Sequence, residues 1–366
     1  MNKKNIFIFA PLIRGGGVEK NLFIIANYLS NYFNKISIIS TSKEFKPKFN
    51  KNIKFITPKN NFWNKTKNRR LKILVCLYLL AKQLMLQRDS KVLSFQGNLY
   101  CCLMCKILNI KIILRSNASI TSLSKGFLKR ILYKAISNMA DKIIVNSLEF
   151  QREYIKYFNL KTKFIYSPLN KKEILKNSKK KLNFPFYKKE TINFINIGRF
   201  VDQKNQLLIL KSFKLLKDKT NHKFKLLMIG SGENKNILLN FIKENNMNSS
   251  IKLINFKKNP FPYLRKSHAF ILSSIFEGLP NVLLEALTLK KLIISSDCPT
   301  GPKEILDHGR GGLIFKMNNE FDLYKKIVFF IKNPNKCKKL INHGHGRLKR
   351  FDYNKNLEQY LKILNS

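Results

Sequence analysis

Short apolar runs alternate along this chain with longer stretches in which apolar residues recur at helical spacing. Such runs predict buried strands of a parallel sheet, and the stretches between them predict amphipathic helices. In the first half, the expected strands are 5–9, 36–40, 92–95, 110–114, 142–145 and 164–166. In the second half, they are 192–197, 224–229, 251–255, 269–272, 292–295 and 313–315. A helix is expected over 19–30, after the first strand, and a last amphipathic helix is expected over 353–364.

This alternation predicts an α/β chain made of two Rossmann-like domains. Residues 170–190 interrupt it, because they are rich in Lys, contain Pro185 and lack periodic apolar positions. The expected parts are an N-terminal domain over 1–180, a linker over 181–190, a C-terminal domain over 191–350 and a helix over 351–366 that returns to the N-terminal domain. Parallel sheets of this kind bind ligands beyond the carboxyl ends of their strands, so we expect a ligand cleft between the two domains.

Composition agrees with this picture, and charge adds to it. The 366 residues are 44% hydrophobic, which suits about two domains. The longest apolar run, 73–81, is shorter than the roughly 20 residues that span a bilayer, and no signal-peptide pattern is present, so we expect a cytoplasmic protein. The net charge is +49, divided into +32 for residues 1–189 and +17 for residues 190–366. Two explanations stay open: Lys enrichment at generic surface positions, and a basic surface for an anionic partner.

Three of the six cysteines form a cluster, Cys101, Cys102 and Cys105, inside an apolar stretch. No His or second Cys pair lies near them in the sequence. We therefore expect buried thiols rather than metal or redox chemistry.

The strongest candidate site follows the expected strand 269–272. Glu277 and Glu285 lie on either side of Gly278 and Pro280, where a helix is expected to start. Free N–H groups at a helix start bind phosphate. Glu277 and Glu285 would be roughly 12 Å apart in a helix, which matches the reach of a nucleotide sugar. The alternative interpretation is a solvated helix face.

A second candidate site ends the expected strand 192–197. Gly198 would let a ligand approach the backbone, and Arg199 and Lys204 would face its diphosphate. Arg is scarce in this chain, so Arg199 at the end of a strand is the more informative of the two cations.

These motifs resemble those of glycosyltransferase family 4, the retaining enzymes of the GT-B fold. The resemblance lies in Gly198-Arg199-x4-Lys204, in Glu277-x7-Glu285, in segment 296–306 and in the glycine loop 16–20. It covers nearly the whole chain and is most specific over 190–315.

The resemblance implies a role for each matched position. Arg199 and Lys204 would stabilise the departing nucleoside diphosphate, Glu277 would bind donor-sugar hydroxyls, and Glu285 would bind the ribose. Donor contacts are also implied for Gly16, Gly17, Gly198, Gly278, Leu279, Pro280, Asn281 and Val282. The loop 255–260 would meet the nucleobase, and UDP is the nucleotide that most members use.

Catalysis in such enzymes is thought to need no protein nucleophile, since the donor phosphate takes the acceptor proton. The chain has no Asp-x-Asp motif, so we expect neither a metal nor another cofactor. Many relatives carry a donor-contacting His in the first half, but the first His here is His222. Ser116 and Asn117 are expected at that place, and they and Glu19 are candidate acceptor or sugar contacts. His343 and His345 are expected in a loop or at a helix start.

The expected acceptor is a glycan or a polyprenyl-linked glycan of bacterial surface polysaccharide or glycoconjugate assembly. Residues 63–72 combine Trp63 with several cations and lead into the apolar run 73–81. This pattern fits an interfacial helix on an anionic membrane, and it fits a core helix with a solvated basic end equally well. We expect a peripheral location at the inner face of the plasma membrane.

Two other functions compete with this one. A GT-B-fold nucleotide-sugar 2-epimerase would share the donor site, although no convincing acid–base set for the sugar C2 is present. A nucleic-acid-binding protein would explain the charge, but the lysines are scattered, without aromatic platforms or a binding motif. We therefore expect no nucleic-acid partner.

Overall fold

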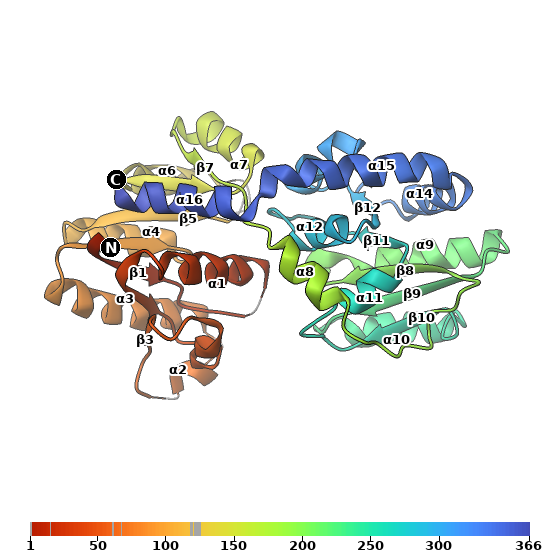
Figure 1. Ribbon diagram of the computed structural model, residues 1–366, viewed down its shortest axis with the longest axis horizontal. Helices are drawn as coiled ribbons and strands as arrows, with labels where there is room; N and C mark the ends of the chain where they lie inside the picture. The colour runs from red at the N-terminus through yellow and green to blue at the C-terminus, as the bar shows by residue number, and fades with distance from the viewer. Residues whose placement is uncertain (1, 15, 61, 67, 118–119, 121–125) are drawn as a thin grey trace. The chain divides into compact units, whose positions relative to one another are not determined.

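The computed structural model describes the whole chain except residues 1, 15, 61, 67, 118–119 and 121–125 (Figure 1). The chain forms two compact units. The first unit comprises Met1–Pro168 and Tyr353–Ser366, and the second comprises Leu169–Asp352.

The first unit contains a parallel sheet of seven strands in the order β3-β2-β1-β4-β5-β6-β7. The strands are β1 (Asn2–Phe9), β2 (Phe33–Ile39), β3 (Lys54–Ile56), β4 (Ser90–Ser94), β5 (Lys111–Ser116), β6 (Lys142–Val145) and β7 (Lys163–Phe164). All six predicted strands are present, and β3 is an additional edge strand. Alternate residues of β1 face opposite sides of the sheet, so Ile6 and Ile8 join one core, and Phe7 and Phe9 join another.

Helices cover both faces of this sheet (Figure 1). The helices are α1 (Gly17–Leu29), α2 (Phe62–Lys65), α3 (Arg69–Leu86), α4 (Asn98–Ile107), α6 (Phe127–Asn138), α7 (Leu148–Glu153) and α16 (Tyr353–Asn365). Two short helical segments, η1 (Lys43–Lys48) and η2 (Tyr154–Phe158), complete the unit. The helices α1 and α16 share the core of Ile6 and Ile8, and α3 and α4 share that of Phe7 and Phe9.

The second unit contains a parallel sheet of six strands in the order β10-β9-β8-β11-β12-β13. The strands are β8 (Ile192–Ile197), β9 (Phe224–Ile229), β10 (Ile251–Ile254), β11 (Ala269–Leu272), β12 (Leu292–Ser296) and β13 (Leu313–Phe315). The helices are α8 (Lys171–Ser178), α9 (Gln206–Lys219), α10 (Lys235–Glu244), α11 (Phe261–Lys266), α12 (Asn281–Thr288), α13 (Pro302–Ile305), α14 (Glu320–Lys332) and α15 (Pro334–Arg347). Short segments η3 (Asp202–Lys204), η4 (Asp307–Gly309) and η5 (Leu348–Phe351) join them. Every predicted strand of this half is present.

The stretch 170–190, which interrupts the predicted alternation, is helical over α8 but not over the expected linker 181–190. Asn170 caps α8, since its side-chain oxygen accepts from the N–H of Glu173 (3.1 Å). Residues 169–180 group with the second unit rather than the first, so the first unit ends earlier in the chain than the expected boundary at 180. The final helix α16 groups with the first unit, where the carbonyl of Leu364 accepts from Nζ of Lys91 (2.7 Å).

The segment 63–81 divides between two helices. Trp63 lies in α2, while Ile73, Cys76 and Leu80 of α3 are buried in the core of the first unit. The helix α3 has a buried face and an exposed basic start, Arg69 and Arg70, and it also exposes the apolar Leu74 and Tyr78, so both interpretations of this segment stay open. Within the described ranges, no helix has the length and apolar character needed to cross a bilayer.

Candidate functional site

Three loops of the second unit meet at the carboxyl edge of its sheet. They follow β8, β11 and β12, which are neighbours in the sheet, so the loops 198–205, 273–280 and 297–301 start side by side. This edge is where parallel α/β sheets place their ligand sites.

Direct hydrogen bonds join the first two loops. The Ser273 hydroxyl donates to the carbonyl of Lys204 (2.7 Å), and the N–H of Ile275 donates to the carbonyl of Gln203 (2.9 Å). The Gln203 side-chain amide donates in turn to the carbonyl of Phe276 (2.9 Å). The backbone around Lys204 is therefore held against the segment that carries Glu277.

Glu277 and Lys204 form an ion pair. Oε1 of Glu277 accepts from Nζ of Lys204 and from the Ser274 hydroxyl (2.6 Å). Both side chains are mostly buried, at 9% and 18% exposure, where a charge pair is screened less than on an open surface. Sequence reasoning assigned these residues separate tasks and did not predict their contact, and it missed Ser274 as a partner.

Glycines allow the loops to pack backbone against backbone. Gly301 has φ +80°, and a Cβ there would lie 1.7 Å from the carbonyl oxygen of Gly278. A Cβ on Gly230 would lie 1.9 Å from the carbonyl oxygen of Gly198. Thr300 reinforces the first contact, because its hydroxyl donates to the carbonyl of Glu277 (2.6 Å).

Arg199 lies in the first loop with an exposed side chain. Its carbonyl accepts from the Gln206 side-chain amide (2.7 Å), which fixes the backbone. Among the described residues, none hydrogen-bonds or ion-pairs with its guanidinium. Arg199 is therefore placed at the same sheet edge as Lys204, with its charge toward solvent.

The expected separation of roughly 12 Å between Glu277 and Glu285 assumed a continuous helix. The segment between them is not one helix, so that assumption was wrong. The helix α12 begins at Asn281, and Pro280 precedes it with an extended backbone. Glu277 therefore lies in the loop, whereas Glu285 is buried in the second turn of α12. Leu279 and Pro280 are buried, and Asn281 and Val282 are half-buried.

The first-unit candidates lie near the start of α1. Gly16 precedes the helix and Gly17 begins it; Gly15 lies outside the described residues. Glu19 is buried in the first turn, with Oε1 3.5 Å from the side-chain amide of Gln96. A Cβ on Gly16 would lie 2.9 Å from the other Glu19 oxygen, so a glycine there leaves room for the carboxylate.

Ser116 ends β5 and is buried, and Asn117 follows it. The Asn117 side chain accepts from the guanidinium of Arg115 and donates to the carbonyl of Phe95 (3.1 Å). Arg115 is fully buried, and its Nε donates to the Tyr360 hydroxyl (2.8 Å). Sequence reasoning missed this buried cation.

The two late histidines lie inside α15, not in a loop or at a helix start. Nε2 of His343 is 2.7 Å from Oδ2 of Asp307, and Nδ1 of His345 is 2.9 Å from the carbonyl oxygen of Leu287. The hydrogen bond from His343 is the main cause that lowers the pKa of Asp307. In the described part of the chain, no group of three or more His, Cys, Asp or Glu is arranged to hold a metal. The expected lack of a cofactor stays a prediction.

Cys101, Cys102 and Cys105 are buried, as predicted, and so are the other three cysteines. Burial raises the pKa of Cys102 to about 11 and that of Cys76 to about 12. Cys298 lies near Glu277, and burial raises its pKa to about 12. A thiol that stays protonated is a poor nucleophile.

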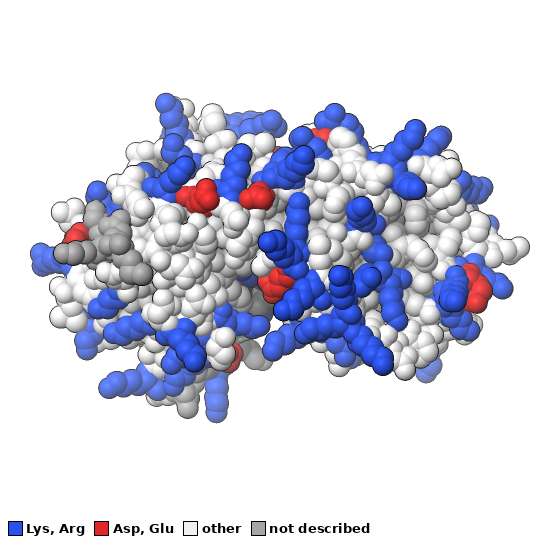
Figure 2. Space-filling view, in the orientation of Figure 1, with Lys and Arg blue, Asp and Glu red and all other residues white. Residues whose placement is uncertain are grey.

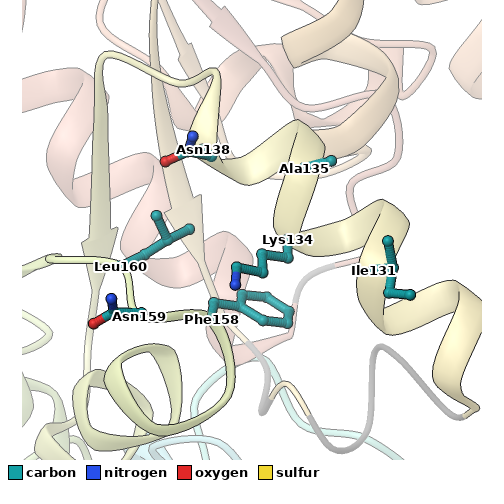
Figure 3. Close-up of a pocket in the computed structure, with 7 residues that line it drawn as sticks. All are labelled: Ile131, Lys134, Ala135, Asn138, Phe158, Asn159 and Leu160. Atoms are coloured by element: carbon teal, nitrogen blue, oxygen red, sulfur yellow. The ribbon is translucent and has the colours of Figure 1, made fainter.

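A hollow of about 360 Å³ lies elsewhere, in the first unit, and contains none of the predicted site residues. Figure 3 shows its walls, with Ile131, Lys134, Ala135 and Asn138 along α6 and Phe158, Asn159 and Leu160 facing them.

The chain has two α/β units, each with a parallel sheet, and candidate ligand-binding loops follow the strands of the second sheet. This is the architecture of the GT-B fold. The fold matches that of Anabaena HepE in complex with UDP, with a TM-score of 0.81, 14% identity and 99% of each chain covered. It also matches a glycosyltransferase from Rickettsia africae, with a TM-score of 0.79, 19% identity and coverage of 100% of this chain and 98% of that one.

The family model for glycosyl transferases group 1 matches residues 149–347, so the chain belongs to this family. An uncharacterized glycosyltransferase of Methanocaldococcus jannaschii is 37% identical over 198 residues, which are 52% of this chain and 48% of the relative. A second relative is the Campylobacter jejuni N-acetylgalactosamine-N,N'-diacetylbacillosaminyl-diphospho-undecaprenol 4-alpha-N-acetylgalactosaminyltransferase. It is 28% identical over 246 residues, 66% of this chain and 64% of the relative. The matched segments thus span about half to two thirds of these relatives.

Proposed function

We propose that this chain is a retaining glycosyltransferase of family 4 that moves a sugar from a nucleotide-sugar donor to a glycan or lipid-linked glycan. The observation that carries the proposal is the meeting of Glu277, Lys204 and Ser274 beside the exposed Arg199, at the start of α12. This places cations, a carboxylate and a helix start at one sheet edge, which suits a diphosphate joined to a sugar.

In the proposed reaction, the bond between the anomeric carbon and the donor phosphate breaks while the acceptor oxygen bonds to the same face of the sugar. The acceptor proton passes to the departing phosphate oxygen. Arg199 and Lys204 stabilise the charge that develops on the diphosphate. The ammonium of Lys204 has three donors, so it can hold Glu277 and a phosphate oxygen together. Glu277 keeps a second oxygen for sugar hydroxyls, and Glu285 takes the ribose.

UDP is the proposed nucleotide, because a protein of the same fold was solved with UDP and with UDP-glucose. A lipid-linked acceptor is proposed because the Campylobacter relative is named for a diphospho-undecaprenol-linked substrate. A role in polysaccharide assembly is supported by a Staphylococcus aureus relative, 31% identical over 183 residues, that is named for capsular polysaccharide biosynthesis. We propose a metal-independent hexosyl- or N-acetylhexosaminyltransferase of the cytoplasm that works at the inner face of the plasma membrane.

No nucleic-acid partner is proposed. Lys and Arg side chains are scattered across the visible face in Figure 2, with broad areas of other residues between them. A dispersed charge of this kind suits a general attraction to anionic surfaces more than a defined groove for one strand.

The test is a binding and turnover assay with a panel of nucleotide sugars. A nucleotide sugar that binds the native protein should raise its melting temperature. Removal of the charge-stabilising guanidinium in Arg199→Ala, or of the carboxylate that pairs with Lys204 and binds the sugar in Glu277→Gln, should lower kcat by about 10²–10³-fold. Arg265→Ala, a change at an exposed arginine of α11, is the matched control and should leave turnover unchanged. Full activity of both site variants, or binding of no nucleotide sugar, would overturn the proposal, and turnover of a donor without acceptor would favour the epimerase.

A further inference from the structure

The helix α6 turns an apolar face to solvent. We call this face the outer stripe, and it consists of Phe127, Leu128, Ile131 and Leu132. Their exposed fractions are 77%, 81%, 50% and 55%. The opposite side of α6 is already in use, because Tyr133 and Ile136 pack against the core of the first unit. The outer stripe is therefore not needed to hold α6 in place.

Cations border the outer stripe. At 3.6 residues per turn, Lys134 falls on one side of the stripe and Lys129 on the other, and both are exposed. The helix α4 packs between α3 and α6, and it adds exposed Tyr100, Leu103 and Ile107. These three helices together carry eight Lys or Arg residues and no Asp or Glu.

The hollow of about 360 Å³ adjoins the outer stripe, since Ile131 lines both (Figure 3). Its opposite wall contains the apolar side chains of Phe158 and Leu160, while Lys134 and Asn138 lie on the α6 wall. The hollow therefore has the same character as the outer stripe, since apolar side chains lie next to a lysine in both.

We infer that the outer stripe of α6, with its flanking lysines, is the surface by which the first unit docks on an anionic phospholipid bilayer. An exposed apolar face bordered by cations is the arrangement of helices that lie in the membrane interface. The apolar side chains enter the headgroup region, while Lys129 and Lys134 remain at the level of the phosphates. The inference rests on the proposed function, which supplies the membrane as partner, and it places the contact on α6 in addition to the earlier candidate segment 63–81.

The test is vesicle flotation of the whole chain with phosphatidylcholine, with and without phosphatidylglycerol. The wild type should float with the anionic vesicles and be released by salt. The variant Leu128→Ser/Ile131→Ser should bind about tenfold more weakly, because two apolar side chains leave the interface. The matched control Ile237→Ser/Leu239→Ser changes two exposed apolar residues of α10 and should bind as the wild type does.

Nucleotide-sugar binding, measured on the same proteins without lipid, separates the two proposals. The α6 variant should keep wild-type donor binding, because the donor loops lie in the second unit. Circular dichroism and urea unfolding like those of the wild type report that its first unit is folded. Equal flotation of wild type and α6 variant would overturn the membrane inference and leave the enzyme proposal standing. A wild-type dimer in lipid-free solution that the α6 variant turns into a monomer would also overturn it, since the stripe would then join two copies. Donor binding by no variant, with flotation retained, would overturn only the enzyme proposal.

Discussion

Gly301→Ala should disturb the candidate site, because the added Cβ would displace the backbone of the loop that contains Gly278. The new Cβ would lie 1.7 Å from the carbonyl oxygen of Gly278 and 2.8 Å from Cδ of Pro280, so the loop before α12 has to move by more than an ångström. The left-handed φ of +80° adds strain of about 1–2 kcal/mol for a residue with a Cβ. Overpacking of a closed contact adds about 1–3 kcal/mol. We expect the second unit to lose about 2–5 kcal/mol of unfolding free energy, as the combined range of these two costs.

Urea unfolding and donor titration measure the two consequences of this change. The unfolding transition of the second unit should move to lower urea, and UDP, the proposed nucleotide, should bind more weakly well below that transition, because Gly278 is displaced. Gly346→Ala is the control: this glycine lies in α15 with open space around its Cβ, and Ala there should stabilise the helix by about 0.5–1 kcal/mol. If Gly301→Ala kept wild-type stability and donor affinity, the packing of this loop would not support the site.

Two further predictions concern other charges and thiols of the second unit. Asp307→Asn should cost about 1–3 kcal/mol at pH 7, because the carboxylate accepts from His343 and Arg310 at 2.7 and 3.0 Å. Because the pKa of Asp307 is lowered in the folded state, its contribution to the free energy of unfolding is present above pH ~4 and is lost as the pH falls through the folded-state pKa. The urea unfolding curves of the wild type and Asp307→Asn should therefore converge in acid. A difference that stays constant with pH would contradict this role of Asp307. Cys298, whose pKa burial raises to about 12, should resist alkylation at neutral pH until the chain unfolds; mass spectrometry of its peptide checks this, and rapid labelling of the native protein would disprove it.

Most strands could be predicted because their signal is local. The run 269–272 is buried on both sides of the sheet, and its sequence is continuously apolar. In 192–197 the apolar signal persists although it is interrupted by the buried Asn193 and Asn196. The strand β3 was missed because it has three residues and lies at an edge, where burial demands little of the sequence. The helix α8 was missed because its composition is that of a solvated loop. It forms around the Asn170 cap and the buried Ile174.

The helix α6 illustrates a different limit. Its apolar residues recur at helical spacing, but periodicity does not reveal whether a stripe faces the core or the solvent. In α3, the stripe containing Cys76 and Leu80 faces inward, whereas in α6 the stripe with Leu128 faces outward. Only the packing of neighbouring helices distinguishes them, and packing depends on the whole fold.

The contact between Glu277 and Lys204 depends on the same non-local information. The two residues are 73 positions apart, and they meet because β8 and β11 are neighbours in the sheet. Their pairing changes how the site handles charge. With Arg199, the three side chains sum to one positive charge, and the carboxylate is already neutralised before a donor arrives. In the proposed function, a diphosphate can then approach Arg199 and the shared ammonium of Lys204 without facing an unpaired carboxylate, so one site could hold both a negatively charged ligand and the glutamate proposed to bind its sugar.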